Sequence, residues 1–165
     1  MKPAVTLIEL LIVIGLVGII AGVGWPNLQS WNCKQQLRND FENFNLYMNK
    51  MQAEATTRSR TTLVQVVIPS GAVSLRPFLV DTKACNGATQ SLQTQIPILT
   101  LSTATRVAGD LTQCFYSDGG ADANSYQFTK TCSGKRYLYK TQIFGATGLI
   151  EKLQYNFTNN RWEDL

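Results

Sequence analysis

The sequence predicts an α+β protein in which a long N-terminal α-helix, apolar at first and amphipathic later, packs on an antiparallel β-sheet domain. Three observations support this prediction: an apolar run over residues 5–26, a helical repeat of apolar residues over 27–60, and stretches rich in β-branched residues over 61–165. The chain has 165 residues, so the part after the apolar run has the size of one globular domain.

The apolar run over residues 5–26 contains one ionisable group, Glu9. A helix that rises about 1.5 Å per residue over this length matches a bilayer core about 30 Å thick, so the run predicts a transmembrane segment. A carboxylate in such a segment costs about 2 to 3.5 kcal/mol on insertion scales, and Glu9 is therefore expected to have a partner. The run is too long for a secretory signal and no cleavage site of small residues closes it.

The stretch VTLIELLIV around Glu9 resembles the processing and assembly signal of type IV pilins and type II secretion pseudopilins. The resemblance implies that prepilin peptidase cuts between Ala4 and Val5, removes a leader of residues 1–4, and leaves an N-terminus that is methylated. It also implies that Glu9 meets the N-terminal amine of a neighbouring subunit during assembly. Pro26 stands at the distance from Glu9 at which this family often has a helix-distorting proline. The family's usual residues at the cut are Gly and then Phe or Met, whereas this chain has Ala4 and Val5.

Glycines are frequent in the second half of the apolar run. Gly18 and Gly22 form a pair at the spacing that lets helices approach closely in lipid. Glycine and Pro26 also lower helix stability, so local melting of the helix around Gly22–Pro26 is an alternative interpretation.

The predicted helix over residues 27–60 has one apolar face. Its steps of three and four residues place the apolar and small side chains on one stripe, with charged and amide side chains off it. We expect this stripe to form the core against the sheet, and we expect the sulfur of its first member to face the domain. The stripe consists of Cys33, Leu37, Phe41, Phe44, Met48, Met51 and Ala55.

After residue 60 the apolar pattern changes to that of strands. The segment from Phe41 to Val67, a helix that runs directly into a strand through an Ala- and Arg-containing turn, resembles the GspH/FimT class of minor pilins and pseudopilins. The last two predicted strands are expected to form a hairpin through residues 145–148. Strands are expected over 61–68, 73–80, 96–101, 126–129, 137–144 and 149–158.

Four cysteines, Cys33, Cys85, Cys114 and Cys132, follow the apolar run. In an exported domain this number predicts two disulfides, for which three pairings are possible. We expect Cys114 to pair with Cys132, which is close to it in sequence, and Cys33 with Cys85. The chain has no His and no C-x-x-C spacing, so neither a zinc site nor a redox site is expected.

Four cations, Lys130, Lys135, Arg136 and Lys140, occur together with Tyr137 and Tyr139 in a stretch without acids. Basic and aromatic side chains suit phosphate contact and base stacking, so this stretch is a candidate DNA-binding surface. The alternative interpretation is a solvated strand edge that discourages edge-to-edge aggregation.

The segment over residues 118–124 (DGGADAN) offers oxygen atoms at alternating positions, but it has too few acids for a calcium loop, and we expect a flexible loop without metal. Because His is absent, the common general base and the Ser-His and Cys-His pairs cannot be built. No enzymatic activity and no cofactor are expected.

The resemblance implies a minor pilin: a structural subunit of a type IV pilus, assembled through its N-terminal helix and placed at the priming complex or tip. The expected partners are other pilins and minor pilins, prepilin peptidase and the bacterial inner membrane. The head domain is expected in the periplasm before assembly and outside the cell afterwards. Two alternatives stay open, a DNA-binding minor pilin for natural transformation, with double-stranded DNA as a partner, and a minor pseudopilin of a type II secretion system.

Overall fold

The computed structural model describes residues 6–68, 72–93, 95–102 and 105–165, and for residues 20–27 it describes the backbone alone. A single helix, α1 (Leu7–Arg58, 52 residues), accounts for the first third of the chain. Thr6 caps its N-terminus, because the hydroxyl oxygen of Thr6 accepts a hydrogen bond from the backbone N–H of Glu9. Ser59, at a φ of 52°, ends the helix in the left-handed conformation.

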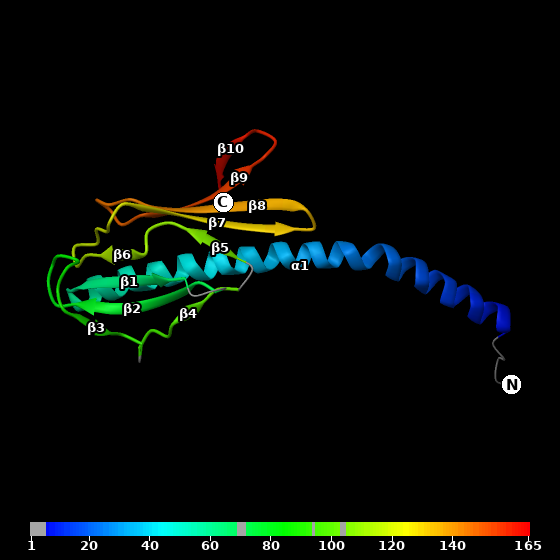
Figure 1. Ribbon diagram of the computed structural model, residues 1–165, viewed down its shortest axis with the longest axis horizontal. Helices are drawn as coiled ribbons and strands as arrows, with labels where there is room; N and C mark the ends of the chain where they lie inside the picture. The colour runs from blue at the N-terminus through cyan, green and yellow to red at the C-terminus, as the bar shows by residue number, and fades with distance from the viewer. Residues whose placement is uncertain (1–5, 69–71, 94, 103–104) are drawn as a thin grey trace.

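The backbone of α1 stays helical through Gly22 and Pro26, so the alternative of local melting in this segment is not what the structure shows. The first half of α1 projects from the head domain and the second half lies along it (Figure 1). In the described part of the chain, no helix is long and apolar enough to cross a membrane, and the transmembrane segment predicted over 5–26 is not found there. Residue 5 and the side chains of residues 20–27 lie outside the described part.

Two antiparallel sheets, where the sequence predicted one, pack with α1 to form the head (Figure 1). The first sheet has the order β3-β2-β1-β6, with β4 also paired to β2, and the second has the order β10-β9-β8-β7-β5. The first consists of β1 (Thr61–Val67), β2 (Ser74–Val80), β3 (Thr89–Ser91), β4 (Leu99–Thr100) and β6 (Thr112–Phe115). The second consists of β5 (Arg106–Ala108), β7 (Asn124–Cys132), β8 (Lys135–Ile143), β9 (Ile150–Asn156) and β10 (Arg161–Asp164).

Five of the six predicted strands are confirmed within a few residues, and so is the hairpin through residues 145–148, which pairs Ile143 with Ile150. The strand predicted over 96–101 is largely wrong, because only Leu99–Thr100 pairs with β2. The sequence did not predict β3, β5, β6 or β10. Each of these has at most four residues, too few for an alternating pattern to stand out.

The predicted apolar stripe of α1 forms the core of the head. From Leu37 to Ala55 its six members have no exposed surface. Phe41 lies at a ring-centroid distance of 5.3 Å from Phe128, edge to face, and of 5.0 Å from Tyr139, stacked. Such aromatic pairs add about 0.5–1.5 kcal/mol each beyond the burial of apolar area. The apolar contacts between α1 and both sheets therefore hold the second half of the helix in the head.

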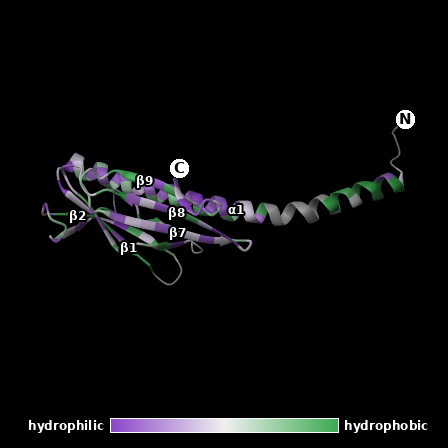
Figure 2. Cartoon of the chain, turned by 90° about the horizontal axis from the view of Figure 1, so that it is seen from above, coloured by the Kyte–Doolittle hydropathy of each residue, from purple (hydrophilic) through white to green (hydrophobic). Residues whose placement is uncertain are grey.

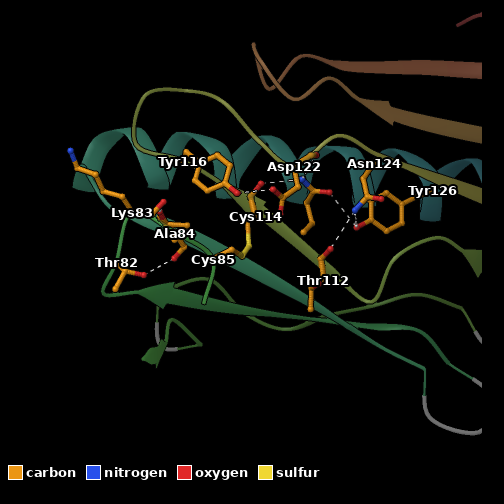
Figure 3. The surroundings of a disulfide bond; sticks show 12 residues. Thr82, Lys83, Ala84, Cys85, Thr112, Cys114, Tyr116, Asp122, Asn124 and Tyr126 are labelled. Atoms are coloured by element: carbon orange, nitrogen blue, oxygen red, sulfur yellow. Dashed lines mark hydrogen bonds between the residues drawn. A yellow bond between two sulfur atoms is a disulfide. The ribbon is translucent and has the colours of Figure 1, made fainter. Parts of the chain in front are cut away.

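Both disulfides exist, but the predicted pairing is wrong. Cys33 of α1 is bonded to Cys132 at the end of β7, with a Cα–Cα distance of 5.7 Å. Cys85 is bonded to Cys114 of β6, with a Cα–Cα distance of 6.2 Å. Figure 3 shows this second disulfide and its surroundings. Proximity in sequence was misleading because β6 belongs to the first sheet, whereas β7 crosses the second sheet over nine residues before it reaches Cys132. The expectation that the sulfur of Cys33 faces the domain is confirmed.

Candidate assembly interface

The N-terminal turn of α1 carries Glu9, the acid for which the family resemblance implies a role in assembly. Glu9 is exposed, and it forms no ion pair with any residue that the structure describes. A carboxylate in the first turn of a helix interacts favourably with the positive end of the helix dipole. Ala4 and Val5, the predicted cleavage and methylation positions, lie outside the described residues.

The helix around Glu9 is apolar on all sides and uncovered. Every large apolar side chain from Leu7 to Ile19 is more than half exposed, from Val13 at 52% to Leu7 at 78%. Figure 2 shows this end of α1 as a hydrophobic segment, whereas the head is mixed in polarity. An isolated soluble chain rarely exposes so large a continuous apolar surface, and a helix that is apolar all round is normally buried on all sides. This segment is therefore an apolar surface that the described part of the chain leaves uncovered.

Three contacts, spaced about one turn apart along α1, hold the helix at the point where it leaves the head. Cys33 is bonded covalently to Cys132, and Gln36 accepts a 3.0 Å hydrogen bond from the ammonium of Lys130. One turn further, the carboxylate of Asp40 accepts hydrogen bonds from the backbone N–H of Ser102 and from the hydroxyls of Ser102 and Thr105. These contacts make the junction between the projecting and the packed half of α1 rigid. Pro26 lies on the projecting side, inside the helix.

The structure separates the four cations that the sequence grouped as a possible DNA-binding surface. Lys130 is buried, at 5% exposed, with its ammonium bonded to Gln36 and Ser102. The ammonium of Lys140 lies 5.8 Å from the centre of the Trp162 ring. Lys135 and Arg136 are exposed at the start of β8. Of the four, only Lys135 and Arg136 are exposed neighbours, whereas Lys140 is half-buried, and the stretch is thus not a single exposed patch.

Nothing in the local sequence groups Lys34 of α1 and Arg106 of β5 with these cations, but the structure brings both to the same end of the head. The ammonium groups of Lys34 and Lys135 lie 5.6 and 5.8 Å from the centre of the Tyr137 ring. Arg106 and Arg136 line one hollow with Thr129 and Thr131. No local signal marks these neighbours, because they meet only through the packing of α1 and the register of β5, β7 and β8.

The loop over residues 118–124 has its carboxylates engaged within the chain. Asp118 accepts a 3.0 Å hydrogen bond from the N–H of Gly120, and Asp122 accepts a 2.6 Å hydrogen bond from the hydroxyl of Tyr116. That bond to Asp122, together with burial and the charge of Asp122, raises the pKa of Tyr116 to about 12.

Metal-ligand atoms gather at one place in the described residues, where Cys85, Cys114 and Asp122 lie within 4.8 Å of one another. The two sulfurs are joined in a disulfide and offer no thiolate to a metal. Figure 3 shows Asp122 turned toward Tyr116 beside this disulfide. Because both sulfurs are in the disulfide and Asp122 accepts a hydrogen bond from Tyr116, these three residues do not form a metal site.

No protein-family model matches the sequence, and neither does any curated protein sequence. Among solved structures, the chain is similar to the minor pseudopilin EpsH from the type 2 secretion system of Vibrio cholerae. The match has a TM-score of 0.53 at 11% sequence identity and covers 72% of this chain and 97% of that one. The resemblance of the sequence around Glu9 and over Phe41 to Val67 points the same way. The chain therefore shares the α+β fold of this pseudopilin, a long N-terminal helix packed on antiparallel sheets.

Proposed function

We propose that the chain is a minor structural subunit of a type IV pilus, assembled through the projecting half of α1. The observation that carries this proposal is the uncovered apolar helix from Leu7 to Ile19, held by a disulfide to a folded head. In a fibre, neighbouring copies of such helices cover one another and remove this surface from water. Each buried apolar side chain of this size contributes about 1.5–3 kcal/mol.

Glu9 sets the register of this assembly. Burying its carboxylate among leucine and isoleucine side chains is unfavourable unless an opposite charge meets it. Cleavage after Ala4 would expose such a charge, the amine of Val5, four positions before Glu9 in the sequence. We propose that the amine of one subunit pairs with Glu9 of its neighbour, that prepilin peptidase creates this amine, and that the nitrogen is methylated.

The two disulfides support a head domain that folds outside the cytoplasm, because cytosolic thiols are kept reduced. We place the head in the periplasm before assembly and on the cell surface afterwards, with the apolar end of α1 at the inner membrane. Fractionation of cells into periplasm, inner membrane and sheared surface fibres tests this location.

A second candidate is a minor pseudopilin of a type II secretion system, which the fold likeness to EpsH favours. Both candidates use the same helix and the same acid. Deleting the gene distinguishes them, because a pilus subunit is needed for surface fibres and a secretion subunit for the release of exported enzymes. In either case we propose a structural role at the priming end of the fibre and no catalysis.

The Glu9→Ala substitution tests the proposal in the native host. We expect the variant to accumulate in cells at the wild-type level but to be lost from the purified fibre fraction by at least tenfold. Glu151→Gln, which removes an acid from β9 of the head, is the matched control and should incorporate normally. Normal incorporation of the Glu9 variant, or a wild-type chain that never enters any fibre, would overturn the proposed assembly role.

A further inference from the structure

The loop between β2 and β3, residues 81–88, contains the one Asn-Gly pair of the chain, Asn86 and Gly87. In such a pair the backbone nitrogen of the glycine can attack the side-chain amide carbon of the asparagine. Glycine has no Cβ to stand in the way of this approach. Whether the reaction takes place in a folded protein depends on how firmly the structure holds the two reacting groups.

The side chain of Asn86 is free to move. It is exposed, and no hydrogen bond among the described residues engages its amide. Other asparagines of the head are held on both sides of the amide. Asn45 donates to a backbone carbonyl and accepts from the hydroxyl of Thr141, and Asn156 donates to Glu163 and accepts from a backbone N–H. Those two side chains would have to give up their hydrogen bonds before they could react.

The attacking group, the backbone nitrogen of Gly87, is also unengaged within the described part of the chain. The packing of the loop requires a glycine at this position. A Cβ on residue 87 would lie 2.5 Å from the hydroxyl oxygen and 2.8 Å from the methyl carbon of Thr82. The contact with Thr82 thus excludes a side chain here, and for the same reason the nitrogen next to Asn86 stays unshielded.

The loop is anchored on both sides of the pair. Cys85 is bonded to Cys114, and the backbone N–H of Asp81 donates a 3.0 Å hydrogen bond to the carbonyl of Ala88. Figure 3 shows the stretch before the pair, where the hydroxyl of Thr82 donates to the carbonyl of Ala84. The two reacting residues therefore lie between fixed points, and any change in the backbone between those points is transmitted to them.

We propose that Asn86 is a site of spontaneous deamidation, with water as the only co-reactant. The nitrogen of Gly87 loses its proton and forms a bond to Cγ of Asn86, and the side-chain amide leaves as ammonia. Water then opens the resulting succinimide ring at either of its two carbonyl carbons, which gives aspartate or isoaspartate. Both products replace a neutral amide by a carboxylate and lower the formal net charge of +4 by one.

The isoaspartate product has a structural consequence at the edge of the first sheet. Its main chain runs through Cβ, which adds one backbone atom between Cys85 and Ala88. Because Cys85 is tethered, the extra length is taken up at the hydrogen bond between Asp81 and Ala88. This bond lies beside the pair of Val80 and Thr89, where β3 joins the sheet as its outer strand. Isoaspartate formation therefore loosens β3, independently of any role of the chain in a fibre.

The test is to incubate the full chain in a neutral detergent and to follow each asparagine by mass spectrometry of reduced and digested samples. Asn160, which is also exposed but is followed by Arg161, is the internal comparison. We expect Asn86 to convert at least about tenfold faster than Asn160, which corresponds to a barrier lower by about 1.4 kcal/mol. The rate should rise from neutral to mildly alkaline pH, because the attacking nitrogen must lose its proton.

Two variants serve as matched controls. Asn86→Gln keeps an amide at this position but would have to close a larger ring, and it should stay unconverted over the same time. Asn86→Asp carries the new charge without the extra backbone atom. Hydrogen exchange of the Asp81 amide should become faster in wild-type protein that contains isoaspartate, and it should stay unchanged in both variants.

Conversion of Asn86 no faster than that of Asn160, or a rate that does not depend on pH, would overturn the proposed site. Unchanged exchange of the Asp81 amide in the isoaspartate form, or equally fast exchange in Asn86→Asp, would overturn the loosening of β3. Neither measurement involves Glu9 or a fibre, so failure here and failure of the proposed function are distinguishable.

Discussion

Cys33 and Cys132 are joined by a disulfide that ties α1 to the end of β7, 99 residues away in sequence. The bond lies at the boundary between the projecting and the packed half of the helix. It fixes where the helix leaves the head, and with the hydrogen bond between Gln36 and Lys130 it fixes the direction of exit. The proposed assembly through the projecting helix requires a rigid connection of this kind, because the head must then move together with the helix as one body.

Removing this disulfide should destabilise the head more than removing the other one. The loop closed by Cys33 and Cys132 spans 99 residues, against 29 for Cys85 and Cys114. Loop-closure entropy then predicts losses of about 4.7 and 3.6 kcal/mol in the free energy of unfolding. Urea unfolding of the two Cys→Ser double variants measures the difference. Equal midpoints, or a larger effect at Cys85 and Cys114, would contradict the ordering.

Truncating the core stripe of α1 should be far more costly than truncating its exposed side. Phe44 is fully buried between Tyr126 and Phe128, whereas Leu46 is 69% exposed. We expect Phe44→Ala to lower the free energy of unfolding by about 3–5 kcal/mol and Leu46→Ala by less than about 0.5 kcal/mol. Denaturant melts of both variants provide the comparison, and similar losses would mean that the helix packs on the sheets in another orientation.

Gly148 should not tolerate a side chain. Its φ is +62°, and a Cβ would lie 2.3 Å from both the amide nitrogen of the Gln52 side chain and the carbonyl oxygen of Gly119. Strained backbone alone costs about 1 kcal/mol, and the clash adds to it. Gly134→Ala is the control, because its φ is +78° but no atom lies within 4 Å of the added Cβ. We expect Gly148→Ala to lower the melting temperature clearly more than Gly134→Ala does; an equal drop would rule out the close contact.

The stability of the head should fall at alkaline pH through Tyr116. Its pKa is raised to about 12, chiefly by the hydrogen bond to Asp122, from an ordinary value of 10.0. Unfolding therefore releases the hydroxyl proton above pH 10, and the contribution of Tyr116 to stability, present below pH 10, is lost as the pH rises toward about 12. Melting temperatures at pH 9 to 12 should fall less steeply for Tyr116→Phe than for the wild type. A variant with an unchanged slope would show that the hydrogen bond does not persist in solution.

Much of the architecture could be read from the sequence, because it depends on local patterns. The steps of three and four residues from Leu37 to Ala55 predicted the buried face of the helix, and the β-branched run after residue 60 predicted β1. The apolar run with its single acid, Glu9, likewise marked the part of α1 that the head leaves uncovered. In each case the information lies within a few turns of helix or one strand, where periodicity alone decides which side is apolar.

Only the tertiary structure decided the disulfide partners and which of the cations lie together. Cys33 meets Cys132 because β7 runs back along α1, and Arg106 meets Arg136 because β5 and β8 flank the same strand. The sequence placed Lys130 among the exposed cations because of its charge, but its ammonium points into the head, where it donates hydrogen bonds to the neutral oxygens of Gln36 and Ser102. These relationships depend on strand order and on which face a residue occupies. A shift of one residue in strand register would move each side chain to the opposite face of the sheet. The local sequence pattern does not determine this register.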